Sequence, residues 1–329
     1  MSAPSAGEAG RPSWNVTTSL PGLQAFVAGE ELADLVDRGV DLVVLTADLS
    51  TSNRLTDFAD RHPERFFNTG IAEQNMVSMA AGLAACGHQA WVGTFAAFAS
   101  LLCAEHLRTD LAYTGMPVRV LAHHAGISMG FYGTSHHAVE DIAVTRAIAG
   151  MVVMAPCDGP ATRACVRAAA LEPGPVYLRL GRGSERDVHA PDVTVERGRF
   201  VRLRSGGDVT VIGTGIGTAA AVAAADRLAD EGIHVGVLDA VYLKPLDVEA
   251  IVAAGRETGR ILTVEEHNVV GGLGSAVAEA IALNGVAARV DKLGIDDEYV
   301  LVAPPTHLYR HYGLTADGVA ERLRSLLRP

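Results

Sequence analysis

Glu73 is the residue whose type and position most strongly suggest chemistry. It lies in Gly70-Ile71-Ala72-Glu73-Gln74-Asn75-Met76, at the start of an expected helix that runs through Ala85 and is otherwise apolar and small. A helix without a polar face is expected to be buried, and a buried carboxylate must be charge-paired, hydrogen-bonded or protonated. The residues alone leave two interpretations open: an acid–base group, or a simple cap of the helix dipole.

Four histidines form a second candidate group, in a glycine-broken loop. They stand as two adjacent pairs twelve residues apart, His123 and His124, then His136 and His137. This spacing does not match a tetrahedral metal site, and acidic ligands follow only at 140 and 141, so we expect no metal here. Neutral imidazoles suit proton transfer to and from a substrate hydroxyl near pH 7.

Two shorter stretches follow predicted strands. Asp48-Leu-Ser-Thr-Ser52-Asn stands where a strand ends, which is where open α/β sheets place ligands, although turn chemistry alone explains these residue types. Thr94-Phe95-Ala-Ala-Phe98 places two aromatic rings at a strand-to-helix junction. Such rings are usually core, but a ring at a strand end can also stack on a heteroaromatic ligand.

These groups are carried by alternating strand-like and helical runs, which predict an α/β fold with two doubly wound domains. Residues 1–18 are predicted to be a mobile tail, 19–182 the first domain, 183–206 a polar linker with a short strand, and 207–329 the second domain. Expected strands cover 41–49, 91–95, 118–122, 151–155 and 176–180 in the first domain, and 209–212, 234–238, 261–264 and 289–293 in the second. Asp158 is a plausible helix cap, and a final helix is expected over 315–327.

Composition narrows the class of protein. The chain has 329 residues, is 49% hydrophobic and carries a formal net charge of -11, which favours a globular protein with large cores and argues against nucleic acid as a partner. Without an uninterrupted apolar run long enough for a membrane span, or an N-terminal signal, we expect a cytoplasmic protein with no membrane partner. The four cysteines show no CxxC pairing and are expected to be free structural thiols.

The stretch around Glu73, followed by Ala80-Ala-Gly-Leu-Ala84 and Thr94-Phe95-Ala-Ala-Phe98, resembles the pyrimidine-binding domain of transketolase and its thiamine-diphosphate relatives. Asp239-Ala-Val-Tyr-Leu-Lys-Pro-Leu246 and Glu265-Glu-His-Asn268 with Gly271-Gly-Leu-Gly274 resemble the C-terminal domain of the same group, which mainly builds dimer contacts there. The resemblance covers most of the chain.

The resemblance implies roles for individual residues. Glu73 takes the position of the glutamate that holds N1′ of the aminopyrimidine and drives the imino tautomer that removes the thiazolium C2 proton. Phe98 is expected to stack on the pyrimidine, with Phe95 as wall and Asp48 near the cofactor. The substrate-facing positions of the family fall on four residues here: Ser52, His124, His136 and Arg182.

Two positions depart from the family pattern. Leu23 stands where an arginine commonly binds substrate phosphate, and Tyr132 stands where sugar-phosphate transketolases carry an acidic residue that contacts the donor hydroxyls. We therefore expect xylulose 5-phosphate and fructose 6-phosphate to be poor donors compared with a modified sugar, a less phosphorylated ketose or a small α-keto acid.

The chain also lacks the family's Gly-Asp-Gly stretch, with its later asparagine, that binds the metal of thiamine diphosphate. We therefore expect the C-terminal subunit of a split transketolase, with Mg²⁺ ligands on an N-terminal diphosphate-binding partner and a self-dimer within an α2β2 assembly. The alternatives are the β subunit of a 2-oxo acid dehydrogenase, a deoxyxylulose-phosphate synthase fragment and a non-catalytic scaffold subunit.

Overall fold

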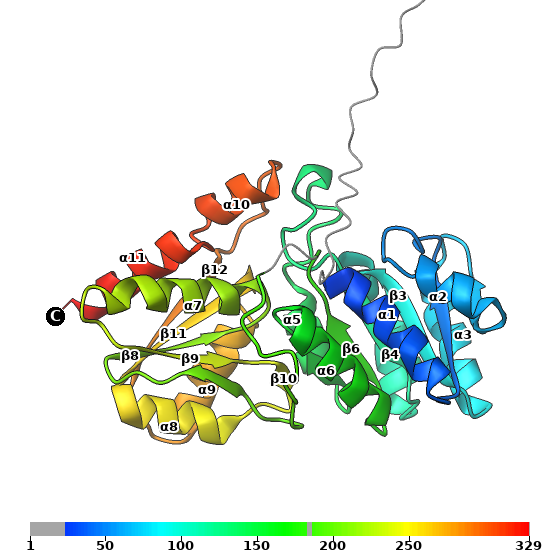
Figure 1. Cartoon of the computed structure of the whole chain (residues 1–329), viewed down its shortest axis with the longest axis horizontal. Helices are drawn as coiled ribbons and strands as arrows, with labels where there is room; N and C mark the ends of the chain where they lie inside the picture. The colour runs from blue at the N-terminus through cyan, green and yellow to red at the C-terminus, as the bar shows by residue number, and fades with distance from the viewer. Residues whose placement is uncertain (1–23, 183–185, 329) are drawn as a thin grey trace, which may run out of the picture.

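The first domain is built on a seven-stranded sheet (Figure 1). The computed structural model describes residues 24–182 and 186–328, with side chains from residue 27 onward. In spatial order the strands are β10 (Tyr242–Lys244), β5 (Val152–Met154), β6 (Val176–Arg179), β4 (Arg119–His123), β3 (Gln89–Phe95), β1 (Leu42–Thr46) and β2 (Phe66–Asn68). Every neighbouring pair is parallel except β10 with β5. The central strands are fully buried, as their valine- and leucine-rich runs predict.

Helices cover both faces of this sheet. One face carries α1 (Gln24–Asp37), α2 (Thr56–Arg61) and α6 (Gly159–Leu171). The other carries α3 (Glu73–Ala85), η2 (Phe98–Leu102), α4 (Ala104–His106), η3 (Leu107–Tyr113) and α5 (Asp141–Ala147). The predicted cap of α6 is confirmed, because the Asp158 side chain accepts the Ala161 N–H at 2.9 Å.

The second domain repeats the arrangement on a five-stranded sheet. Its spatial order is β12 (Arg289–Ile295), β11 (Arg260–Asn268), β8 (Val209–Gly213), β9 (Val235–Asp239) and β7 (Val201–Arg204), with only β7 antiparallel. On one face lie α7 (Ile216–Ala229), α10 (Pro305–His311) and α11 (Ala316–Leu327), and on the other α8 (Val248–Thr258) and α9 (Leu273–Leu283). Two doubly wound α/β domains are thus confirmed.

The two domains share a strand and a core. β10 belongs to the second half of the chain but completes the first sheet by pairing with β5. One hydrophobic cluster is continuous across both domains, joining Ile142 and Val153 of the first to Leu238 and Val277 of the second. Both domains are therefore expected to hold their relative placement by apolar packing.

Some expectations differ from the observed elements. The short strand expected within the linker 183–206 is observed as β7, but it is also an edge of the second sheet, and the predicted tail, 1–18, lies outside the described residues. Neither β10 nor α10 was predicted, because three and seven residues are too short to show a period. Within the described parts of the chain, no helix is long and apolar enough to cross a membrane.

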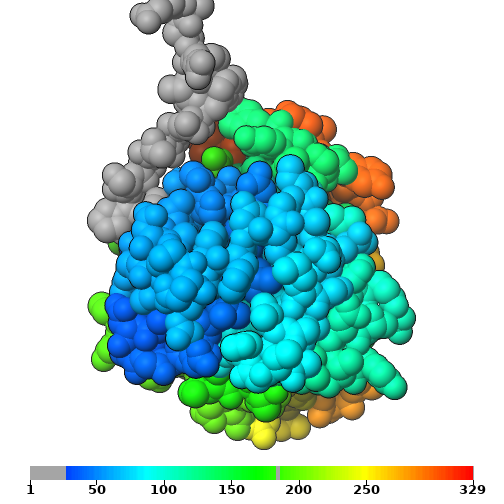
Figure 2. Space-filling view, turned by 90° about the vertical axis from the view of Figure 1, so that its right-hand side faces the viewer, coloured from blue at the N-terminus to red at the C-terminus, as the bar shows by residue number. Residues whose placement is uncertain are grey.

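The helix after Glu73 is not buried on all sides as expected. Its inner face, with Met76 and Ala80, is fully buried against the sheet, but Met79 is 42% exposed. α3 lies on the face of the first domain turned to the viewer in Figure 2. A hollow of about 450 Å³ there is lined by Phe67, Met79, Gly82, Leu83 and Cys86. Apolar composition alone did not reveal that one face of this helix has no neighbour among the described residues.

Candidate active site

Parallel pairing brings the candidate residues to one edge of the first sheet. Thr46, near the end of β1, pairs with Gly93 of β3 and with Asn68 of β2, and Phe95 at the end of β3 pairs with His123 of β4. Parallel strands end at the same edge, so the residues that follow them gather there.

Five side chains form what we call the ring cluster: Phe95, Phe98, His124, Tyr132 and His136. The ring centroid of Phe95 lies 4.6 Å from that of His124, 5.8 Å from Phe98 and 5.9 Å from His136. His136 also lies 5.2 Å from Phe98 and 4.9 Å from Tyr132. The two predicted phenylalanines and the two predicted substrate-facing histidines are thus brought together.

The histidine loop returns to the sheet because its two ends pair. Gly126 and Ala138 exchange backbone hydrogen bonds of 3.1 and 2.9 Å. Gly126 has a φ of +63°, and a Cβ added there would come within 2.1 Å of Glu266 Cδ, so glycine is required. Glu266 Oε1 accepts the Ile127 N–H at 2.8 Å. A carboxylate of the second domain therefore fixes the loop that carries His136.

His124 and His136 are held neutral. His124 is buried in a left-handed conformation with a φ of +58°, and its Nδ1 has no hydrogen-bond partner in the part of the chain that the structure describes. Burial and the charges of His123, Arg182 and Arg54 hold the pKa of His124 well below its usual value. Burial also lowers the pKa of His136, whose Nδ1 lies 2.9 Å from Ser135 Oγ. Both imidazoles are therefore neutral near pH 7, and each has one ring nitrogen that can donate a hydrogen bond and one that can accept one.

Glu73 occupies the first turn of α3 and is 6% exposed. The N-cap residue, Ala72, provides no side-chain cap, and Glu73 makes no side-chain hydrogen bond with the described residues. Its charge adds to burial in raising the pKa of the Cys103 thiol to about 12. A favourable interaction with the helix dipole remains, but the carboxylate oxygens are free to bind a ligand.

Asn68 connects Asp48 to the turn before Glu73. The Asp48 N–H donates to Asn68 Oδ1 and the Asn68 amide donates to Asp48 Oδ1, both at 3.0 Å. The same Oδ1 accepts the Gly70 N–H at 3.0 Å. Sequence analysis missed Asn68, although an asparagine between a strand and a Thr-Gly turn was the available signal.

The two other residues predicted to face substrate, Ser52 and Arg182, differ in how they relate to the ring cluster. Ser52 is exposed and no described contact joins it to the ring cluster. Arg182 is also exposed, but its charge contributes to lowering the pKa of His124, so it lies within electrostatic range. Arg54, which sequence analysis overlooked, acts on His124 in the same way. Two guanidinium groups therefore act on the buried imidazole.

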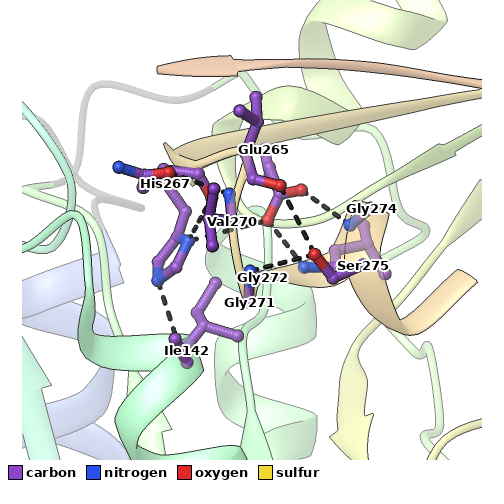
Figure 3. Close-up of polar contacts among 12 residues, drawn as sticks. Ile142, Glu265, His267, Val270, Gly271, Gly272, Gly274 and Ser275 are labelled. Carbon is purple, nitrogen blue, oxygen red and sulfur yellow. Dashed lines mark hydrogen bonds and ion pairs between the residues drawn. The ribbon is translucent and has the colours of Figure 1, made fainter. Parts of the chain in front are cut away.

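Hydrogen bonds of Glu265 and His267, which we call the joint, lie at the end of β11 and hold α5, the helix after the histidine loop (Figure 3). His267 Nε2 accepts the Ala143 N–H at 3.3 Å, while its Nδ1 lies 2.7 Å from the Asn268 carbonyl oxygen and donates to it. Glu265 accepts the N–H groups of Leu273 and Gly274 at 2.6 and 2.7 Å, which fixes the start of α9. The joint therefore connects α5 of the first domain with β11 of the second.

Comparison with known proteins gives the family. The model of the transketolase pyrimidine binding domain matches residues 25–186, and that of the transketolase C-terminal domain matches residues 198–319. The chain belongs to the transketolase family. This transketolase-family chain is 40% identical over 297 residues to the putative transketolase C-terminal section of Methanocaldococcus jannaschii, covering 90% of the chain and 93% of the relative.

Two further relatives have the same extent. A subunit of the apulose-4-phosphate transketolase of Phocaeicola vulgatus is 39% identical, and the alignment covers 89% of the chain and 93% of the relative. A solved structure titled as a split gene transketolase, inactive beta4 tetramer, is 43% identical with a TM-score of 0.84 and covers 93% of this chain and 98% of that one. The transketolase domains predicted from Glu73 and the other motifs are confirmed by these matches.

His123, beside the ring cluster, predicts an acid-sensitive fold. It is fully buried, neither ring nitrogen has a hydrogen-bond partner among residues 24–182 and 186–328, and burial lowers its pKa to about 3. The unfolded chain takes up this proton near pH 6.5, so folding stability falls as the pH drops below about 6.5. His123→Leu should reduce the loss of unfolding free energy between pH 7 and pH 5 by about 2 kcal/mol, measured by urea denaturation.

The exposed His307 provides the control for this measurement. His307→Leu should leave the difference between pH 7 and pH 5 as it is in the unsubstituted chain. An unchanged difference in His123→Leu would contradict the assignment of a neutral, buried His123.

Proposed function

We propose that the chain is one subunit of a two-component, thiamine-diphosphate-dependent transketolase that moves a two-carbon ketol unit from a ketose-like donor to an aldehyde-type acceptor. The observation that carries this proposal is the buried carboxylate of Glu73, which has no side-chain hydrogen bond among the described residues and lies at the sheet edge that holds the ring cluster. A purely structural carboxylate in such a place would be paired, since an unpaired buried charge is costly.

The residues present fit thiamine diphosphate. Glu73 provides a carboxylate that can bind an aminopyrimidine, and Phe98 is a half-buried ring near the end of β3 that can stack on it. His124 Nδ1, which has no hydrogen-bond partner among the described residues, can bind another polar group of the cofactor or substrate. When bound, the cofactor supplies a thiazolium that stabilises a carbanion at the reacting carbon. Glu73 holds and returns a proton at its carboxylate, and the neutral His124 and His136 exchange protons with substrate hydroxyls.

We propose that a partner subunit completes the site. The relatives that have the same extent as this chain are named as a C-terminal section, as one subunit of an apulose-4-phosphate transketolase and as a split gene product. The exposed apolar face of α3, with the hollow beside Met79, is a surface that a partner of complementary shape can cover. The partner would hold Mg²⁺ and the diphosphate, in a cytoplasmic α2β2 assembly.

The first test is activity of the chain alone. With thiamine diphosphate, Mg²⁺ and a panel of ketose donors, the purified chain should show no turnover and weak cofactor binding, because the diphosphate and metal ligands are on the partner. Adding a diphosphate-binding partner should restore both. Turnover by the chain alone would contradict the two-component proposal.

Glu73→Gln should abolish activity of the reconstituted complex without disrupting assembly. The amide keeps the shape but cannot hold the proton, so kcat should fall by about 10²–10⁴-fold, or about 3–5 kcal/mol of barrier. Steady-state kinetics measures the loss, and gel filtration shows whether both subunits still associate. Glu64→Gln, at an exposed position of the preceding 3₁₀ turn, is the control and should keep full activity. Full activity in Glu73→Gln would return Glu73 to a capping role.

Tyr132 is the residue that bears most directly on the choice of donor. Leu23 lies outside the described residues, and Arg54 supports phosphate binding near His124 together with Arg182, because guanidinium groups bind phosphate well. The loss of one family arginine is therefore offset. The Tyr132 ring, 4.9 Å from His136, places an aromatic wall where the family has an acidic contact to donor hydroxyls.

We therefore predict that xylulose 5-phosphate and fructose 6-phosphate are poor donors and that Tyr132→Asp raises kcat/KM for xylulose 5-phosphate by about tenfold, the value of one hydrogen bond to a charged group. Tyr132→Phe keeps the ring and should not change the preference. The measurement is kcat/KM for each donor with the reconstituted pair. A wide preference of the unsubstituted enzyme for xylulose 5-phosphate would contradict this role of Tyr132.

A further inference from the structure

Three potential metal ligands of different chemistry meet where α6 begins. Cys157 and Asp158 lead into this helix of the first domain, and His189 lies in the segment that leads to the second domain; all three are buried. Their ligand atoms all lie within 4.8 Å of one another. Cys157 Sγ is 3.5 Å from His189 Nδ1, and that nitrogen is 3.0 Å from Asp158 Oδ2.

These distances are close to the edges of a tetrahedral zinc site. Zinc bonds of about 2.3 Å to sulfur and about 2.1 Å to nitrogen or oxygen place sulfur and nitrogen about 3.6 Å apart, and nitrogen and oxygen about 3.4 Å apart. Asp158 Oδ2 is already oriented by the N–H groups of Val188 and His189, each at 2.8 Å. A thiolate together with an imidazole favours zinc over magnesium or calcium.

A fourth buried group faces the same imidazole. Asp239, at the end of β9, is fully buried, and its Oδ2 lies 3.4 Å from His189 Nε2. Its other oxygen accepts the Thr218 hydroxyl at 2.7 Å. Two buried carboxylates thus share one imidazole, a charge imbalance that a divalent cation would offset.

We propose that Cys157, Asp158 and His189 bind a structural Zn²⁺ ion through Sγ, a carboxylate oxygen and Nδ1, and that Asp239 accepts a hydrogen bond from Nε2, the other ring nitrogen, and so orients the imidazole. On binding, the Cys157 thiol releases its proton to solvent, and His189 binds through the lone pair of a neutral Nδ1. The ion would join the first domain to the connecting segment, and the contact of His189 with Asp239 would link that segment to the second sheet.

The alternative is a site without metal, in which His189 is an imidazolium between the two aspartates. This alternative predicts that the chain contains no zinc and that Cys157 stays a thiol. A measurement of metal binding therefore distinguishes the two interpretations. Sequence spacing could not suggest the cluster, because Cys157, His189 and Asp239 are far apart in the chain.

The test uses the full chain, purified without chelators or metal-affinity columns. Elemental analysis should find about one zinc per chain. After removal of zinc with a chelator, the chain should take up one Co²⁺ and show a thiolate-to-cobalt charge-transfer band. Cys157→Ser should remove this band, and His189→Gln should weaken zinc binding, measured against a chromophoric chelator, by about 100-fold or more. Asp239→Asn should weaken it by about 10–100-fold.

Cys165→Ser is the matched control, because Cys165 is a buried thiol on the same helix that is not among the three ligands. It should keep one zinc and the cobalt band. Circular dichroism establishes that each variant is folded; if Cys157→Ser does not fold, the band of the unsubstituted chain and of Cys165→Ser decides the question. A folded chain that contains no zinc and binds neither Zn²⁺ nor Co²⁺ stoichiometrically would overturn the proposal, as would a cobalt band that persists in Cys157→Ser.

Discussion

The parallel pairing of β1, β3 and β4 is the constraint on which the site depends. Phe95 stands opposite His123, so the next residue, His124, meets the Phe95 ring at a centroid distance of 4.6 Å. A slip of one residue would turn Phe95 to the opposite face of the sheet. Gly93 shows how tightly this register is fitted, because a Cβ there would come within 2.7 Å of Leu55. The same pairing makes the ends of the strands available for ligand contacts.

The second domain helps to position the histidine loop of the first. Arg179 of β6 forms a buried ion pair with Asp141 of α5 at 2.8 Å and donates to the Glu266 carbonyl oxygen at the same distance. The Glu266 carboxylate in turn holds the start of the histidine loop at Ile127. Because both domains share one apolar core, the loop that carries His136 is positioned by elements from both halves of the chain. A rigid support of this kind is what a proton-transfer site requires.

The motifs around Glu73, the two phenylalanines and the paired histidines were sufficient to predict the fold, the family and most of the ring cluster. Each of these residues has a local signal, such as a strand end or a glycine-broken loop. Asn68 and Arg54 were missed because their roles depend on neighbours distant in sequence, Asp48 in one case and His124 in the other. β10 was missed because its partner, β5, is about ninety residues away and the strand is only three residues long.

The exposed and unpaired groups of this chain share a physical explanation. His124 Nδ1 is a buried polar atom without a hydrogen-bond partner among the described residues, which costs about 1–3 kcal/mol, and Glu73 is a nearly buried carboxylate without a side-chain hydrogen bond to those residues. The His124 backbone, with a φ of +58°, adds strain of about 1–3 kcal/mol. Such costs persist only when the surrounding structure enforces them, and here they gather at one sheet edge. On the same domain the outer face of α3 leaves Met79 and a hollow uncovered. The strain and the unpaired polar groups lie at the site, and the adjoining helix, α3, has an apolar face that the described residues leave uncovered. A chain retains such features when a ligand and a second subunit satisfy them in the assembled enzyme.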